Sequence, residues 1–299
     1  QAQALASSGP ALRRSAAGFR GKRPLGTFLF AGPTGVGKTE MAKAISEVVF
    51  PGIPMTRIDM SELSQPHAVA RLLGAPPGYI GHDDGGQLTE AVRHRPYQLV
   101  LLDEIEKAHM EVLLSLLPLL DEGRLTDGRG RTVDFTNTVI VMTSNLGVEP
   151  NSARSRIGFG GEGRGDAEAS ARSEQVLARV RSALPPELWN RIDEPLCFLP
   201  LSESELSEIA RRMLRGVAEL AHREHRVQLR FDESVGALLL RSGGFDPQLG
   251  ARPMRRTVGR MVEAPLASAL LAGELEALVD VVGVAQGDAV AFEGSQAPA

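Results

Sequence analysis

The segment GPTGVGKT, residues 32–39, limits what this chain can fold into more than any other stretch. It follows the apolar run TFLFA and precedes a segment with helical spacing of its apolar residues, KTEMAKAISEVV. The motif G-x-x-x-x-G-K-[ST] requires this context of strand, glycine loop and helix. There, backbone N–H groups and the helix N-terminus hold a nucleotide's phosphates. The alternative is a glycine-rich turn with an unrelated lysine, which the flanking segments disfavour.

Two sets of residues follow from this motif. Lys38 is expected to contact the β- and γ-phosphates of ATP, and Thr39 to ligate Mg²⁺. Asp103 and Glu104 follow a second apolar run, LVLL. We expect Asp103 to hold the Mg²⁺ shell and Glu104 to orient the attacking water. Alone, the acidic pair fits a helix cap, but beside a phosphate loop it predicts an NTPase. The expected nucleotide-binding loop is Gly32, Pro33, Thr34, Gly35, Val36, Gly37, Lys38 and Thr39.

Apolar runs alternate with helical patterns over the first two thirds of the chain. This alternation predicts an α/β fold with a parallel sheet covered by helices on both faces, from the runs at 27–32, 55–60, 99–104, 138–145 and 194–201. After Pro200 the pattern is mainly helical, beginning with a capping box at Ser202. We expect a large α/β domain over residues 1–199 and a small, mainly helical domain over 200–299.

Three local features carry their own expectations. Residues 148–173 are rich in Gly, Ser, Arg and Glu, which predicts a long unstructured loop. Pro118 is expected to kink the helix predicted over 110–123, because it removes a helical hydrogen bond. A final strand is expected at ALVDVV, residues 277–282, followed by a frayed tail.

Composition excludes several classes of protein. The net charge is −4, so no basic excess is available for a nucleic-acid partner. No apolar run reaches the roughly 20 residues that span a bilayer, so we expect no membrane partner. Cys197 is the single cysteine, which leaves no disulfide framework and favours the cytoplasm.

The segment GAPPGYIG, residues 74–81, places Tyr79 and Ile80 between glycines and after two prolines. Prolines exclude an inner strand or helix, and glycines make the backbone permissive. One interpretation is a surface turn whose tyrosine packs on the body of the protein. The other is a loop that presents an aromatic side chain to a passing partner.

Seven segments of the chain form one pattern by their order and spacing. They are FLFAGPTGVGKTEMAKA, RIDMSE, RLLGAPPGYIG, GGQLTEAVRHRPYQLVLLDEIEKAH, DEGRLTDGRGRTVDFTNTVIVMTSNLG, PELWNRIDE and GFDPQLGARPMRR. Together they resemble the AAA+ ATPases, and among them the C-terminal ATPase module of Clp unfoldases of the ClpA, ClpC or ClpB kind. The resemblance covers nearly the whole chain. It implies an AAA+ P-loop fold, in which a five-stranded parallel sheet flanked by helices precedes a smaller helical domain.

The resemblance implies roles for three further residues. Asn145 falls at the sensor-1 position beside Glu104, although an asparagine also commonly ends a strand. Arg191 falls at the arginine finger that reaches the γ-phosphate of a neighbouring subunit; the alternative is an ion pair with Asp193 or Glu194. Arg252 falls at sensor 2 on the small domain, with a solvated arginine as its alternative.

The same resemblance implies a function. A finger supplied by a neighbour implies a homo-oligomeric ring, hexameric in this family. Tyr79 and Ile80 would line its pore and grip unfolded or tagged protein substrates. Asp127–Phe135 matches a further pore-facing loop, with a solvated turn as the alternative.

The tripeptide Ile157, Gly158 and Phe159 resembles the motif that docks Clp unfoldases onto a ClpP-type peptidase. The alternative is a stand-alone disaggregase of the ClpB kind, with both side chains packed on the body. The sequence disfavours two other functions. A nucleic-acid motor or clamp loader is disfavoured by the acidic charge, and a non-hydrolysing ring by Glu104, Asn145 and Arg191.

Overall fold

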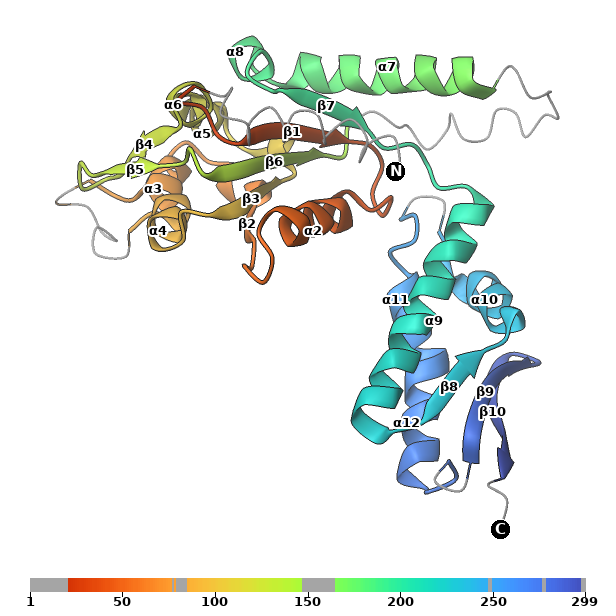
Figure 1. Cartoon of the computed structure of the whole chain (residues 1–299). Coiled ribbons are helices and arrows are strands. Elements are labelled where there is room, and N and C mark those ends of the chain that lie inside the picture. Colours follow the sequence, from red (N-terminus) through yellow and green to blue (C-terminus); the bar gives the residue numbers. More distant parts are fainter. Residues whose placement is uncertain are drawn as a thin grey trace. The chain divides into compact units, whose positions relative to one another are not determined.

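The computed structural model describes residues 21–76, 78, 85–146, 165–246, 249–275 and 278–296 (Figure 1). The chain divides into two compact units, Gln1–Pro33 with Gly37–Leu199 and Thr34–Val36 with Pro200–Ala299. Tyr79, Ile80, Ile157, Gly158 and Phe159 lie outside the described residues.

A parallel sheet is the framework of the first unit. Its strand order is β2-β3-β6-β1-β7, and every neighbouring pair is parallel. This confirms the five-stranded sheet predicted from the apolar runs. The strands are β2 (Thr56–Asp59), β3 (Gln98–Asp103), β6 (Thr138–Ser144), β1 (Gly26–Ala31) and β7 (Glu194–Cys197).

Three strands, β1, β3 and β6, are buried along their whole length. Successive side chains of a strand point to opposite faces, so such strands must be covered on both sides. In Figure 1, α2 (Lys38–Val49) lies on one side of the sheet and α7 (Gly165–Ala183) on the other. The predicted covering of both faces is confirmed.

Short helices complete the first unit. They bury Leu72, Leu88 and Val112 in one cluster with strand residues such as Leu102 and with Val180 of α7. A two-stranded hairpin, β4 (Arg124–Thr126) with β5 (Thr132–Asp134), precedes β6. The helices are α3 (Ala68–Leu73), α4 (Gln87–His94), α5 (Met110–Ser115), α6 (Leu117–Glu122) and α8 (Pro186–Trp189), with 3-10 turns η1 (Met60–Leu63) and η3 (Ile105–Lys107).

Two expectations about this unit are modified. The helix predicted over 110–123 is divided at Leu116, and Pro118 stands in the first turn of α6, where its missing N–H costs no helical hydrogen bond. The unstructured loop predicted over 148–173 is wrong at its C-terminal end, because α7 begins at Gly165. Ala, Glu and Arg dominate that end and are good helix formers.

The second unit begins with the long helix α9 (Glu203–His225). The predicted capping box is present: Glu205 N–H donates to Ser202 Oγ at 3.3 Å, and Ser202 N–H donates to Glu205 Oε2 at 2.9 Å. A further helical pair consists of α11 (Met254–Val258) and α12 (Ala264–Leu271), joined by a π-helical segment, η6 (Gly259–Glu263). Pro265 stands in the first turn of α12. The second unit also contains α10 (Glu233–Leu239), followed by η5 (Leu240–Gly244).

A three-stranded sheet, in the order β10-β9-β8, packs with these helices. Its strands are β8 (Gln228–Phe231), β9 (Leu278–Gln286) and β10 (Ala289–Gln296). The frayed tail predicted after residue 282 is therefore wrong through Gln296, because β10 pairs with β9 in a hairpin. Within the described ranges, no helix combines the length and apolarity needed to cross a membrane.

Truncating a buried side chain of β3 should destabilise the first unit. Leu102 is 1% exposed, so Leu102→Ala leaves a cavity and should lower the free energy of unfolding by about 2–5 kcal/mol. Leu114, on α5, is 40% exposed, and Leu114→Ala should cost less than about 1 kcal/mol. Urea unfolding followed by the fluorescence of Trp189, the single tryptophan, compares them. Equal losses in the two variants would contradict the described core.

Candidate functional site

The glycine loop runs from the end of β1 to the start of α2. Gly32 has φ 151°, and Gly37, the N-cap of α2, has φ 99°, a region that disfavours other residues. A Cβ on Gly32 would overlap the Phe198 carbonyl oxygen. Gly32 N–H donates to Ser144 O at 3.1 Å, which places the loop beside the end of β6. Pro33, Thr34, Gly35 and Val36 continue the loop, and Thr39 lies half-buried in the first turn of α2.

Lys38 is buried under this loop, with 7% of its surface exposed. Its Nζ donates to Gly32 O and Pro33 O, both at 2.7 Å, and to Asn145 Oδ1 at 2.8 Å. Burial lowers the pKa of Lys38 to about 8, while the negative charges of Glu106, Asp103 and Glu104 oppose that shift. A buried ammonium beside a glycine loop and the N-terminus of α2 suits an anionic ligand.

Asn145 connects this lysine to the acidic pair. Its Oδ1 accepts from Lys38, and its Nδ2 donates to Glu104 Oε1 at 2.8 Å. The structure thus brings together three residues predicted separately from the sequence, and the Glu104 carboxylate is held at the strand ends. Glu104 has φ 58° and is one of two non-glycine residues with positive φ in the described ranges. Such a conformation is uncommon and often marks a functional position.

Asp103 lies at the end of β3 and is 8% exposed. Arg57 of the neighbouring strand donates to its Oδ2 from Nε at 3.0 Å and from Nη2 at 2.6 Å. The Thr143 hydroxyl donates to Asp103 Oδ1, and Thr143 Oγ1 accepts from Glu104 N–H at 3.0 Å. A carboxylate has about four lone-pair sites, so these bonds orient Asp103 and leave it acceptor capacity.

Three residues of this site were missed in the sequence. They are Arg57 and Thr143, which fix Asp103, and Glu106, whose Oε1 accepts from Asn145 N–H at 3.0 Å. Each stands two residues from a position with its own signal: Asp59 in the segment RIDMSE, Asn145 and Glu104. For Arg57 and Thr143, which lie in strands, a spacing of two places side chains on the same face and was the available indication. Glu106 stands in the 3-10 turn η3, where this rule does not apply.

Arg191 follows α8 and is held within the first unit. Its Nε lies 2.6 Å from Asp121 Oδ1, and its Nη1 donates to Glu187 O. The alternative ion pair with Asp193 or Glu194 is not the one formed, since Asp193 instead pairs with Arg23 at 3.0 Å and accepts from Thr27 N–H at 2.8 Å. Arg252, in the second unit, is exposed just before α11.

Comparison with protein families shows to which family the chain belongs. A model described as AAA domain (Cdc48 subfamily) matches residues 23–195, more than half of the chain. The chain belongs to the AAA family of ATPases. Residues 201–284 match a second model, the C-terminal D2-small domain of ClpB protein. Together they confirm the resemblance to Clp-type ATPase modules.

Individual relatives agree with this family. Chaperone protein ClpB of Corynebacterium efficiens is 47% identical over 299 residues, covering 98% of this chain and 32% of the relative. ClpB of Bacteroides thetaiotaomicron is 43% identical over 294 residues, covering 98% and 34%. The ATP-binding subunit ClpC of the ATP-dependent Clp protease of Staphylococcus epidermidis is 46% identical over 277 residues, covering 91% and 33%. The chain spans about a third of the length of these relatives.

The AAA site has the donors that a nucleotide and its metal ion need. Lys38 and the N-terminus of α2 supply positive charge under the loop. The Thr39 hydroxyl and the oriented Asp103 carboxylate are oxygen ligands, the kind that Mg²⁺ prefers. The residues present therefore fit both groups.

The low pKa of Lys38 predicts pH-dependent nucleotide binding. Phosphate favours the charged lysine, so binding raises a pKa that starts near 8. ADP affinity should therefore fall about 1.5-fold between pH 7.5 and 8 and more steeply above pH 8, by up to about tenfold per pH unit. Calorimetry up to pH 9.5 in buffers of different ionisation enthalpy should show uptake of about half a proton at pH 8, and more at higher pH.

Lys43→Met is the control for this experiment, because Lys43 is an exposed lysine of the same helix that pairs with Glu40 at 2.6 Å. The variant should keep the full pH dependence. An affinity that stays flat to pH 9.5 in the unmodified protein would contradict the assigned role of Lys38.

Proposed function

We propose that this chain is the ATP-hydrolysing motor module of a cytoplasmic protein unfoldase that works as a ring. One observation carries the proposal: Asn145 joins Lys38 to Glu104 by hydrogen bonds of 2.8 Å. A lysine under a phosphate loop, bonded through one amide to a carboxylate, pairs phosphate binding with a means of orienting water. The two domain matches, AAA followed by the ClpB small domain, support protein unfolding as the work performed.

Each residue of the site has a proposed role. Lys38 and the loop residues 32–37 hold the phosphates, and Glu104, positioned by Asn145, orients the attacking water. Thr39 and Asp103 would hold Mg²⁺, which would supply positive charge to the phosphate oxygens. Arg57 and Thr143 keep Asp103 in place. Arg252 is the proposed sensor 2 of the small domain.

Arg191 supports a ring in which neighbouring subunits complete each other's sites. Asp121 and the Glu187 carbonyl hold its guanidinium, and its side chain is still 28% exposed. A partly exposed, oriented arginine suits a finger for a neighbour's γ-phosphate, which is worth about 10³–10⁵ in rate in other NTPases. We propose a hexamer by analogy with the family.

Substrate contact is proposed for Tyr79 and Ile80. An aromatic and a β-branched side chain can grip a polypeptide whatever its sequence. The glycines around them allow the backbone of the segment to move. The substrates proposed are unfolded or tagged proteins.

Delivery of the substrate to a ClpP-type peptidase is the finer proposal, and two observations favour it. The tripeptide Ile157–Gly158–Phe159 offers two apolar anchors in a glycine-rich segment. One relative, ClpC, is itself named as a subunit of the Clp protease. The ClpB relatives and the ClpB small domain favour the alternative, a stand-alone disaggregase. Binding of the full-length protein to a ClpP-type ring decides between them.

The unfolding proposal is tested by ATP-dependent unfolding of a tagged fluorescent protein by the full-length protein. Glu104→Gln should abolish both ATP turnover and unfolding, because a neutral amide cannot accept the proton of the attacking water. Tyr79→Ala should hydrolyse ATP and unfold at least about tenfold more slowly, since grip and not chemistry is lost.

Tyr97→Ala is the matched control, because Tyr97, the other tyrosine, is 58% exposed just before β3. It should unfold the substrate at the wild-type rate. Normal unfolding by Tyr79→Ala would refute the gripping role, and unfolding by Glu104→Gln at the wild-type rate would refute the motor.

A further inference from the structure

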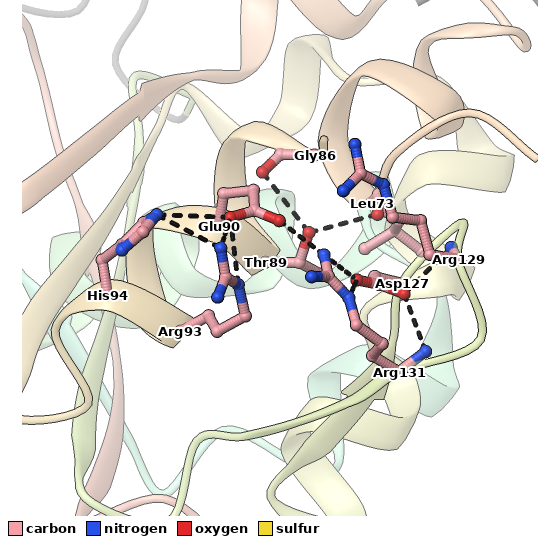
Figure 2. A network of polar contacts seen from close by, with 9 residues as sticks. All are labelled: Leu73, Gly86, Thr89, Glu90, Arg93, His94, Asp127, Arg129 and Arg131. Carbon is pink, nitrogen blue, oxygen red and sulfur yellow. Dashed lines mark hydrogen bonds and ion pairs between the residues drawn. The ribbon is translucent and has the colours of Figure 1, made fainter. Parts of the chain in front are cut away.

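The segment that carries Tyr79 and the turn Asp127–Arg131 share one junction, shown in Figure 2. The segment leaves α3 at Gly74 and returns to α4 at Gly86. The Thr89 hydroxyl has one proton and lies within hydrogen-bond distance of both ends, with Leu73 O at 3.1 Å and Gly86 O at 3.3 Å. The ends of the segment are thus fixed together at the start of α4.

The turn between β4 and β5 packs directly on this closure. Gly128 N–H donates to Leu73 O at 3.1 Å. A Cβ on Gly128 would overlap the carbonyl oxygens of Gly74 and Ala75, and one on Gly86 would overlap the backbone of Leu73. Three stretches of backbone therefore meet with no room for side chains, so a shift of one requires a shift of the others.

Asp127 and Arg131 hold the turn in shape. The Asp127 side chain is 4% exposed and accepts from Arg129 N–H at 2.9 Å, from Arg131 N–H at 2.8 Å and from Arg131 Nε at 2.7 Å. Burial alone would raise the pKa of Asp127, but these hydrogen bonds outweigh burial and lower it. The carboxylate therefore stays charged and bound.

Arg131 also reaches out of the turn to α4. Its Nη2 lies 2.6 Å from Glu90 Oε1, while Glu90 Oε2 accepts from Arg93 Nε at 3.0 Å and lies 3.4 Å from His94 Nε2. The guanidinium thus joins carboxylates from two different elements, as the dashed lines in Figure 2 show. Lysine lacks this planar fork and cannot hold both in the same geometry.

We propose that Glu90, Arg131 and Asp127 form a positioning network that makes the turn Asp127–Arg131 and the anchored ends of the Tyr79 segment move as one unit. The inference rests on the proposed function, in which Tyr79 grips substrate. It assigns Glu90 the role of transmitting the position of the turn to that grip. An isolated pair of exposed charges would constrain only its own two side chains. Here Arg131 pairs both with the buried Asp127 carboxylate and with Glu90 of α4, at the shared junction.

Hydrogen exchange in the full-length protein tests the network directly. Glu90→Gln should accelerate exchange about two- to fivefold in peptides covering both residues 70–76 and residues 127–131, because loosening one element releases the other. Arg131→Lys should accelerate the same two peptides. The control is Glu122→Gln, which removes the exposed pair of Glu122 and Arg124, 2.7 Å apart, at the other end of the same hairpin, and should change neither.

Unfolding of a tagged fluorescent protein supplies the second readout. Glu90→Gln should keep the basal ATP turnover, since Glu90 is no part of the nucleotide site, and unfold about two- to fivefold fewer substrate molecules per ATP hydrolysed. Unchanged exchange, faster exchange in one peptide only, or an unchanged yield per ATP would each overturn the network. If the wild-type protein does not unfold the tagged substrate, that result contradicts the proposed function instead. The hydrogen-exchange measurement then still supports or overturns the coupling.

Discussion

Burial of β1, β3 and β6 on both faces is the constraint on which the rest of the structure depends. Because these parallel strands are neighbours in the order β3-β6-β1, their carboxyl ends meet at one edge of the sheet. The phosphate loop leaves β1 there, Asp103 and Glu104 leave β3, and Asn145 leaves β6. Hydrophobic burial of the strands thus holds these polar groups in place at one edge of the sheet. Without it, the like charges would repel one another and the polar groups would stay hydrated.

A neutral amide lies between the charges at this edge. Lys38 is buried near three carboxylates, yet it donates to the oxygen of Asn145, directly after β6, and the other side of that amide binds Glu104. The amide therefore positions both groups without neutralising either one. The hairpin β4–β5 continues into β6, so the turn Asp127–Arg131 belongs to the stretch of chain that ends at Asn145. The two regions for which we propose functional roles therefore stand on one continuous part of the fold.

The sequence predicted this sheet and its loop well because apolar runs and the glycine-lysine motif are local signals. Side-chain partners were harder to predict. Arg191 pairs with Asp121, 70 positions earlier, and no local pattern indicates that contact. Arg57 meets Asp103 only because β2 and β3 pair in register. The start of α7 and the strand β10 lie in Gly- and Ala-rich segments, whose composition alone indicates neither where a helix begins nor the pairing of strands. The roles of Tyr79, Ile80 and Ile157–Phe159 stay predictions.

The central claim, that Asn145 couples phosphate binding to Glu104, is tested most directly by measuring ATP turnover and ADP affinity of Asn145→Ala in the full-length protein. The account predicts a turnover about 10² or more below wild type with ADP affinity within about threefold, because the water-orienting carboxylate is released while Lys38 remains. Ser144→Ala, which removes a hydroxyl that accepts from Leu146 N–H at 3.2 Å at the same strand end, should match wild type. Wild-type turnover in Asn145→Ala, or a loss of ADP affinity that accounts for the whole loss of rate, would contradict this coupling between phosphate binding and Glu104.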